Sequence, residues 1–312
     1  MSEPRTSPTN VCVLLAGALK SSPLTAASGM SVLDLWLTRE RTVLGLWIDA
    51  LRETGRPWEV RVAHNRQTPS PRELGEHDGV MVREVVDSGS YRGPAGVARD
   101  ATEDVSDDAE VLVCEAGRWI SSGLTELLHA HEVGGADVTV GVNPDQSPAG
   151  VFALRRTALK LAPAVGFMDM KEQWLDRVRA TGGNVRGLTL SGRGALPLRS
   201  RLGFVRAGMT AAGWTGSDDL DEVRTIEGGG ANAGAVFRVI GAGAGIGAGA
   251  HVEDSIVMGD AMVGAGALVV RSVVCPGARV EAGAEVVDAI VGTRGVVRDM
   301  EGRQERMERN RA

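Results

Sequence analysis

A period of seventeen residues runs from Ile240 to Val291 and constrains this chain more than any other feature. Aliphatic residues recur in it at spacings of 6, 6 and 5, three times over. They are Ile240, Ile246, Val252, Val257, Val263, Val269, Val274, Val280, Val286 and Val291. Period-six repeats of this kind are typical of a parallel β-helix, in which each coil buries its face only against neighbouring coils. A flexible linker rich in glycine and alanine has no reason to place an aliphatic side chain at each fixed step.

A second apolar series lies four places after the first and supports the same interpretation. Its members are Ala244, Ala250, Ile256, Ala261, Ala267, Val273, Ala278, Ala284 and Ile290. The alternation of large and small side chains predicts that both series fill the inside of a narrow tube. We also expect Gly247, Gly264 and Gly277 to stand at tight corners with positive φ, which glycine adopts without steric cost.

Length and composition limit the class of protein. At 312 residues the chain is long enough for two domains with proper cores. Its 34 basic and 40 acidic residues give a net charge of −6, which argues against a nucleic-acid partner. Cys12, Cys114 and Cys275 lie far apart without CxxC spacing, so we expect no disulfide framework, no zinc site and a cytoplasmic location. No stretch approaches the roughly 20 apolar residues of a membrane span, so we expect no membrane partner.

Strand-like and helix-like segments alternate before the repeat. We expect strands over 10–16, 58–63, 78–86, 111–114 and 136–142, and helices over 39–54 and 124–131. The apolar run 11–19 could also imitate the hydrophobic part of a signal peptide, but a buried first strand explains it better. This alternation predicts an α/β fold with a mostly parallel sheet, and ligands gather at the carboxyl ends of the strands in such sheets.

These patterns divide the chain into four segments. We expect an α/β domain over 1–200, a junction over 201–235, the coils over 236–295 and a charged tail over 296–312. The junction contains three consecutive glycines at 228–230. We expect the tail to be a solvated or frayed helix without a functional signal of its own.

Four short motifs follow one another in an order that resembles one family. Leu15-Ala16-Gly17-Ala18-Leu19-Lys20-Ser21-Ser22-Pro23-Leu24-Thr25 looks like a contracted L-A-G-G-x-G-T-R-x-x-P-L-T loop, and the segment Arg92 to Arg99 looks like a G-T-A-G-A segment. Ala149-Gly150-Val151-Phe152 is similar to an A-G-I-Y strand, and Gly166 to Gln173 is similar to a G-x-x-D-x-K-E-Q stretch. With the coils, the chain resembles the sugar-phosphate nucleotidyltransferases, such as mannose-1-phosphate guanylyltransferases and their glucose-1-phosphate relatives.

The resemblance implies a Rossmann-like nucleotidyltransferase domain of the GT-A type, followed by a left-handed parallel β-helix. In the implied reaction, a sugar 1-phosphate oxygen attacks the α-phosphorus of a nucleoside triphosphate, and a nucleotide sugar and pyrophosphate are formed. Backbone N–H groups of the glycine loop then cradle phosphates, cations neutralise developing charge, and carboxylates hold Mg²⁺.

The resemblance also assigns roles to the positions that match its motifs. The nucleotide-binding candidates are Leu15, Ala16, Gly17, Ala18, Gly93 and Pro94. The sugar-binding candidates are Gly150 and Lys171, the catalytic cation is Lys20, and the candidate Mg²⁺ ligands are Glu115 and Asp169. A homo-oligomer formed through the β-helix is compatible with the same resemblance.

The chain departs from the family pattern where the chemistry takes place. The loop after the first strand is two residues shorter and lacks a glycine and an arginine, so Lys20 is its only cation. The family's P-K-P element is replaced by residues 29–33, and its metal-binding aspartate by Cys114-Glu115-Ala116-Gly117. Glu115 then stands as the substitute ligand.

Each candidate also has an ordinary structural explanation. Lys20 is equally compatible with an exposed loop lysine, and Glu115 with a carboxylate that caps a helix or faces water. Asp169-x-x-Glu172 before Trp174 forms a capping box at a helix start, which competes with the metal role.

Three functions therefore stay open. The first is an active nucleotidyltransferase that makes a nucleotide sugar. The second is a non-catalytic relative that binds a nucleotide or nucleotide sugar and regulates or scaffolds another protein. The third is a β-helix acyltransferase with His251 as its base, although about three coils are few for that architecture.

Overall fold

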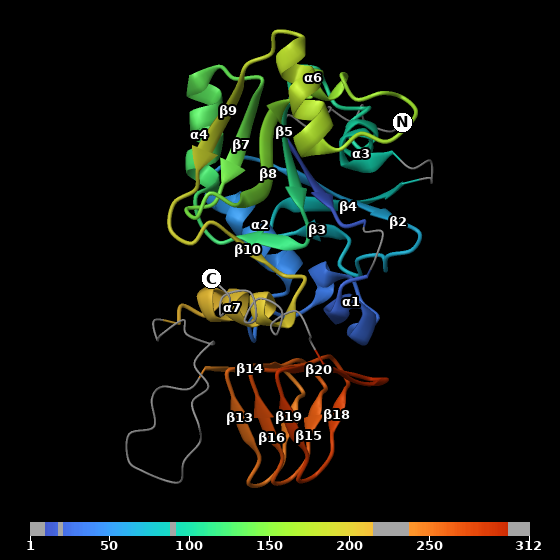
Figure 1. Cartoon of the computed structure of the whole chain (residues 1–312), viewed down its shortest axis with the longest axis vertical. Coiled ribbons are helices and arrows are strands. Elements are labelled where there is room, and N and C mark those ends of the chain that lie inside the picture. The colour runs from blue at the N-terminus through green and yellow to red at the C-terminus, as the bar shows by residue number, and fades with distance from the viewer. Residues whose placement is uncertain (1–9, 18–20, 88–91, 215–236, 299–312) are drawn as a thin grey trace, which may run out of the picture. The chain divides into compact units, whose positions relative to one another are not determined.

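The computed structural model describes residues 10–17, 21–87, 92–214 and 237–298 of the chain. The chain forms two compact units (Figure 1). The first comprises Met1–Lys20 and Leu44–Leu196, and the second comprises Ser21–Val43 and Pro197–Ala312. Each unit has a cluster of buried apolar side chains of its own.

An eight-stranded sheet forms the centre of the first unit, in the strand order β3-β4-β2-β1-β5-β8-β7-β9. Its strands are β1 (Asn10–Leu15), β2 (Glu59–Asn65), β3 (Gly75–His77), β4 (Val80–Asp87), β5 (Glu110–Glu115), β7 (Val138–Val142), β8 (Pro148–Arg155) and β9 (Val185–Thr189). β1 pairs in parallel with β2 and β5, β2 with β4, and β7 with β9. β3 and β8 run antiparallel to their neighbours. The predicted α/β fold with a mostly parallel sheet is confirmed.

Helices pack on this sheet. They are α2 (Val43–Glu53), α3 (Gly93–Asp100), α4 (Leu124–Gly134), α5 (Arg156–Leu159), the π-helical turn η2 (Met170–Trp174) and α6 (Leu175–Ala180), and a short ladder joins β6 (Arg118–Ile120) to β10 (Ala195–Pro197). One core cluster joins α3, α5, η2 and α6 to β1, β5 and β8 through side chains such as Ala98, Trp174 and Val178. Among the described helices, none has the length and apolar character that crossing a membrane requires.

The helix expected over 39–54 begins only at Val43. Before it, Trp36 and Thr42 form an antiparallel bridge, and Leu37 N donates a hydrogen bond to Arg41 O at 3.1 Å. These bonds hold the preceding residues in a turn, so the apolar periodicity overestimates the helix at its start.

The second unit contains a parallel β-helix, drawn as stacked orange and red strands in Figure 1. Its three sheets have the orders β11-β14-β17-β20-β21, β12-β15-β18 and β13-β16-β19. The strands are β11 (Arg238–Ile240), β12 (Gly245–Ile246), β13 (His251–Glu253), β14 (Ser255–Val257), β15 (Met262–Val263), β16 (Leu268–Val270), β17 (Val273–Val274), β18 (Arg279–Val280), β19 (Glu285–Val287), β20 (Ala289–Gly292) and β21 (Gly295–Arg298). The parallel pairs join residues seventeen apart, such as Val257 with Val274 and Val263 with Val280. The sequence period is therefore the length of one coil.

The interior of the coils holds most of the first apolar series. Its buried members are Val252, Val257, Val263, Val269, Val274, Val280, Val286 and Val291, which share one cluster with Ala261, Ala267 and Ala278. Ile240 is partly buried against this cluster. Ile246 is 40% exposed, because it lies in β12 at the edge of its sheet. Ile246 is in register with the interior residue Val263, so it occupies an interior position of the coil whose outer side no further strand of this sheet covers.

Three members of the second series face away from the tube, namely Ile256, Val273 and Ile290. They are fully buried but are not part of the interior cluster. Because side chains alternate along a strand, Ile256 points away from the interior that Val257 fills. Helix α7 (Arg201–Ala211) covers Ile256 on this outer side, since a Cβ on Gly208 would lie 2.7 Å from Ile256 Cδ1. The prediction that these three side chains fill the tube is wrong, because they lie on the outer side of their strands and are buried there.

Two further elements belong to the second unit, α1 (Pro23–Ser28) and the 3₁₀ turn η1 (Val32–Asp34). α1 packs against β20 and β21, where a Cβ on Gly292 would lie 2.8 Å from Ala27 C. Residues 201–211, expected within the junction, form α7, and residues 296–298, expected within the tail, belong to β21. The three glycines at 228–230 and residues 299–312 lie outside the described part of the chain.

Positive φ recurs at the three corners of the coil with the same period. The corner sets are Gly243, Asp260 and Gly277; Gly249, Gly266 and Gly283; and Asp254, Arg271 and Asp288. The prediction for Gly277 is confirmed, whereas Gly247 and Gly264 have no positive φ and their prediction is wrong. They lack a side chain for another reason. A Cβ on Gly247 would lie 2.7 Å from Ala265 Cα, and one on Gly264 would lie 2.7 Å from Ala282 Cα, both in the next coil.

Candidate functional site

The carboxyl ends of β1 and β5 bring Leu15 beside Glu115. The two residues are paired in the register of the parallel strands, and Ala116 N donates a hydrogen bond to Leu15 O at 3.1 Å. This is the edge at which ligands gather in open α/β sheets. Two residues that the motifs place in one site, 100 positions apart, therefore do lie together.

The turn after β1 is tied to β2. Ala16 N and Gly17 N both donate hydrogen bonds to Ala63 O, at 2.8 and 3.2 Å. These two N–H groups are satisfied by the sheet, so a phosphate cradle in this loop would need the N–H groups of later residues. A Cβ on Gly17 would lie 3.4 Å from Asn65 N, which is an ordinary van der Waals contact, and Gly17 is exposed. Ala18 and Lys20 lie outside the described residues.

Glu115 is held between two cations. Its Oε1 accepts a hydrogen bond from Lys171 Nζ at 2.7 Å, and its Oε2 accepts one from Arg118 Nε at 3.3 Å. Arg118 opens β6 after the turn that follows Glu115, whereas Lys171 lies in η2, 56 residues after Glu115. The side chains of Glu115, Arg118 and Lys171 are 38%, 25% and 36% exposed. The carboxylate is thus anchored at both oxygens and does not simply face water.

The cations decide the charge of Glu115. Burial by itself raises the pKa of this carboxyl, but the hydrogen bond and charge of Lys171, together with Arg118, outweigh burial and lower the pKa below its usual value. Glu115 is therefore ionised at neutral pH and forms ion pairs with both partners.

Gly150 makes room for this arrangement. Its φ is +70°, and a Cβ there would lie 3.0 Å from Glu115 Cδ and 2.9 Å from Arg118 Cδ. A side chain at this position of β8 would displace the ion pair between Glu115 and Arg118. The structure therefore brings Gly150, a candidate sugar contact, against Glu115 and its partners.

Asp169 acts as the N-cap of η2. Its Oδ1 accepts hydrogen bonds from Lys171 N at 2.7 Å and Glu172 N at 2.9 Å. Asp169 N donates a hydrogen bond to Gln173 Oε1 at 2.8 Å. The side chain that bonds back to the N-cap residue is therefore that of Gln173, whereas the capping-box pattern predicts Glu172. The capping explanation of Asp169 is confirmed. Its side chain fixes the turn that presents Lys171 to Glu115.

Gly93 and Pro94 open α3 beside the segment that leads to Asp169. Met168 N donates to Arg92 O at 3.1 Å, and Ala95 N donates to Met168 O at 3.2 Å. Gly93 has a φ of +68°, and a Cβ there would lie 2.6 Å from Met168 O. The glycine is needed for both its backbone conformation and this close approach.

The residues present do not fit a Mg²⁺ ion shared by Glu115 and Asp169. Mg²⁺ takes oxygen ligands at about 2.0–2.1 Å in near-octahedral geometry. Both oxygens of Glu115 already accept from cations, and Oδ1 of Asp169 accepts from two backbone N–H groups. Within the described residues, no three His, Cys, Asp or Glu side chains gather where they could hold a metal ion. The chemistry of this edge is that of two cations around one carboxylate.

Arg118 is the site residue that sequence reasoning missed. Its backbone is held by α2, where Trp47 Nε1 donates to Arg118 O at 3.2 Å. A signal for it exists in the sequence Glu115-Ala116-Gly117-Arg118, because a short turn after a strand places residues three apart close together.

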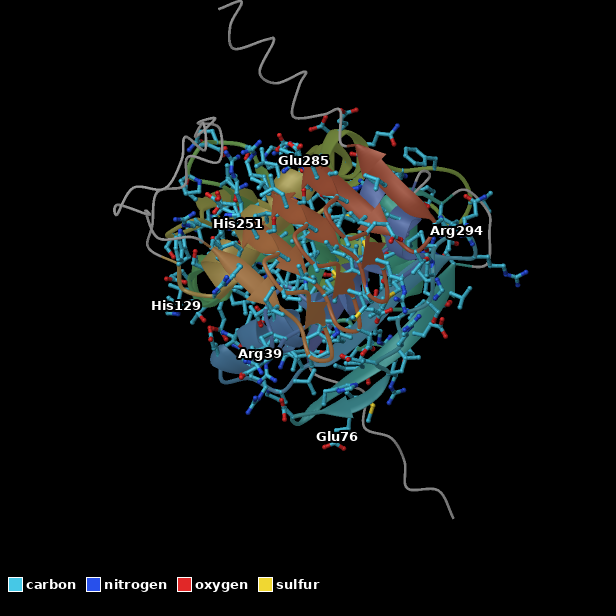
Figure 2. All side chains as sticks on the ribbon, turned by 90° about the horizontal axis from the view of Figure 1, so that it is seen from below. Arg39, Glu76, His129, His251, Glu285 and Arg294 are labelled. Carbon is cyan, nitrogen blue, oxygen red and sulfur yellow. The ribbon has the colours of Figure 1, made fainter. Side chains whose placement is uncertain are left out.

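His251 lies in β13 of the coils (Figure 2). It is in register with Leu268 and, one coil further, with Glu285. Its Nε2 forms a hydrogen bond with Glu253 Oε2 at 3.1 Å, and its side chain is 55% exposed. His251 and Glu253 belong to the same strand, so their hydrogen bond brings no residue from another part of the chain to His251. It therefore gives no additional support to the acyltransferase hypothesis.

Comparisons with known proteins agree with this architecture. Residues 223–303 match the family described as GlmU-like, C-terminal hexapeptide. A UDP-glucose pyrophosphorylase from Acinetobacter baumannii superimposes with a TM-score of 0.53 at 12% identity, covering 65% of this chain and 93% of that chain. A structure described as UTP-bound UGPase from Acinetobacter baumannii gives a TM-score of 0.52 at 11% identity, with the same two coverages. No curated protein matches by sequence.

At these identities the structural similarity establishes the fold. The chain is similar to the sugar-phosphate nucleotidyltransferases in fold, and it carries a hexapeptide region at its carboxyl end. The resemblance drawn from the motifs is confirmed at this level.

Proposed function

We propose that the first unit binds a nucleoside triphosphate or a nucleotide sugar at the edge formed by the ends of β1 and β5. We also propose that it transfers nucleotidyl groups to a sugar 1-phosphate slowly or not at all. The nucleotidyltransferase fold supports the binding half of this proposal, since one structure of similar fold is described as UTP-bound. For the chain as a whole, we propose a regulatory or scaffolding role.

The observation that carries the proposal is the state of Glu115. Nucleotidyl transfer depends on cations, in most cases Mg²⁺ held by carboxylates, to neutralise charge on the phosphates. Glu115 instead accepts hydrogen bonds from Lys171 and Arg118. Losing one oriented charge contact in a transition state costs about 10²–10³ in rate. The loop after β1 has also lost its arginine, so two such losses reduce turnover far below the usual range.

A coupled pyrophosphate assay, run beside a binding assay, tests both halves. The four common nucleoside triphosphates would be combined with sugar 1-phosphates, and ligand binding would be followed through the melting temperature, which rises when a ligand binds only the native state. We expect a rise in melting temperature with at least one nucleotide or nucleotide sugar, and pyrophosphate release far below the enzyme median of about 10 s⁻¹.

The opposite results are equally clear. Turnover near 10 s⁻¹ that disappears in Glu115→Gln would establish an active nucleotidyltransferase in which Glu115 is a metal ligand. Absence of any shift, with nucleotides and nucleotide sugars at millimolar concentration, would reject the binding site itself.

A further inference from the structure

Three charged groups meet at the carboxyl end of β5, two from one turn and one from a distant part of the chain. Lys171 comes from η2 and Arg118 from β6, and both donate to Glu115. Two cations and one anion leave one net positive charge in this group at neutral pH. We call Lys171, Arg118 and Glu115 the charged triad.

The triad is reachable from solvent and is held in place. Between a quarter and two fifths of each side chain is exposed. The backbone of Arg118 is fixed by Trp47, and that of Lys171 by the Asp169 cap. A site whose donors are held by the fold before binding loses less entropy when the ligand arrives.

A Mg²⁺ ion and a phosphate group would meet this triad very differently. A metal ion would have to displace Lys171 and Arg118 from Glu115 and then remain close to both cations. Repulsion between like charges opposes this. A phosphate oxygen could instead replace the Glu115 carboxylate on Lys171 and Arg118. Arginine offers a planar fork of donors to phosphate and lysine offers a point charge, so the two cations suit a phosphate anion.

We infer that the charged triad binds the phosphate groups of a nucleotide without a divalent metal, with Lys171 and Arg118 as the cations and Glu115 as the internal anion that the ligand replaces. This rests on the proposed binding function and specifies how its phosphate site works. Glu115 then lowers the affinity of the site, because each binding event must break its two ion pairs.

Calorimetric titration of the full chain tests this inference. The four common nucleoside triphosphates and inorganic pyrophosphate would each be titrated in EDTA and again in excess MgCl₂. We expect the dissociation constant in EDTA to equal that in MgCl₂ within about threefold, or to be lower. Binding that appears only with MgCl₂ would overturn the inference while leaving the proposed function intact. Absence of binding in both conditions would overturn the inference, and it would reject the proposed function as well if nucleotide sugars also fail to bind.

Matched lysine variants show whether the triad is the site. Lys171→Met should weaken binding in EDTA by at least about tenfold, since it removes a charge-assisted hydrogen bond to phosphate. Lys160→Met removes the same charge from an exposed lysine paired with Asp107 and should leave binding unchanged. Equal effects of the two variants would overturn the inference.

Glu115→Gln gives the sharpest contrast with a metal site. Removal of the internal anion should leave binding in EDTA as tight as before or tighter, whereas loss of a metal ligand weakens binding. Weaker binding of this variant in EDTA would overturn the inference. Melting temperatures check that the variants fold, and salt titration of the wild type gives a second readout, because an ionic site weakens as salt rises. A dissociation constant that does not change with salt would also count against the triad.

Discussion

Arg271 donates two parallel hydrogen bonds to Asp288, from Nε to Oδ1 at 2.9 Å and from Nη2 to Oδ2 at 2.8 Å. The two residues are seventeen positions apart and occupy the same corner of successive coils, with φ of 45° and 53°. Arg201 of α7 also approaches Asp288, with Nη2 at 3.1 Å from Oδ1. The corner formed by Asp254, Arg271 and Asp288 contains no glycine and is stabilised by ion pairs. The carboxylate of Asp288 also joins α7 to the coils.

Asp288→Asn should destabilise the second unit. Asparagine tolerates the left-handed conformation, so the change removes the charge and leaves the backbone unstrained. A hydrogen bond to a charged group contributes about 1.5–3 kcal/mol, and the 43% exposure of Asp288 reduces this, so we expect a loss of about 1–2 kcal/mol. Urea unfolding measures it. Asp260→Asn, the same change at an exposed left-handed corner, is the control, and an equal loss in both variants would show that the ion pairs contribute nothing.

Two glycines of one coil should respond differently to alanine. Gly266 has a φ of +67° and no atom lies within 4 Å of the place that a Cβ would take, so Gly266→Ala should cost about 1–2 kcal/mol in backbone strain alone. Gly264→Ala should cost more, about 3 kcal/mol, because its Cβ would lie 2.7 Å from Ala282 Cα. The next coil cannot move away without breaking the hydrogen bond from Gly264 N to Val280 O at 2.8 Å. Urea midpoints compare them, and a milder effect of Gly264→Ala would contradict this account of coil spacing.

The coils were predictable because aliphatic residues recur in the sequence with the period of one coil. A repeat fixes which residues stack, as the pairing of Val257 with Val274 shows. It does not show what lies outside the tube, and Ile256 is buried against α7 in a way that no repeat encodes. The repeat also does not separate a glycine needed for positive φ, such as Gly277, from one needed for close approach, such as Gly264.

The candidate site was predictable in its location and less so in its chemistry. Strand order places the ends of β1 and β5 together, so motifs far apart in sequence could be assigned to one edge. The ion pair of Glu115 with Lys171 depends on how η2 is turned by the Asp169 cap, which is a tertiary feature. A pattern of acidic residues therefore indicates metal ligands, whereas the fold pairs one of them with cations and uses the other as a cap.

His131 should make the first unit sensitive to mild acid. Burial, reinforced by the charge of Arg155, lowers the pKa of this histidine below its usual value near 6.5. The unfolded chain then binds more protons than the folded one below about pH 6.5, so stability falls as the pH falls, by at most about 1.4 kcal/mol per pH unit. Urea unfolding from pH 5 to 7.5 should show this slope in the wild type and a smaller slope in His131→Gln.

The control for this pH dependence lies on the same helix. His129 is an exposed residue of α4, so His129→Gln should leave the slope as it is in the wild type. Identical slopes for the wild type and His131→Gln would show that another group titrates in this range.

The three cysteines should report separately on the two units. Cys12 and Cys114 are buried in the sheet of the first unit, and Cys275 is buried in the coils. Burial raises the pKa of the Cys114 thiol, with a further contribution from its hydrogen bond with Cys12, and burial raises the pKa of Cys275 to about 12. Thiolate is the reactive form, so we expect no labelling by a thiol reagent at pH 8 while both units are folded.

A charge placed inside the coils should expose only one of these thiols. Val269→Asp puts a carboxylate where the native side chain is 0% exposed, at a cost of roughly 4 kcal/mol, and should unfold the coils. Mass spectrometry after labelling at pH 8 should then find Cys275 modified and Cys12 and Cys114 protected, because the first unit keeps its own core. Met262→Asp, on the outer side of the same coil where the native side chain is 42% exposed, should leave all three protected. Modification of all three cysteines in Val269→Asp would show that the two units unfold together.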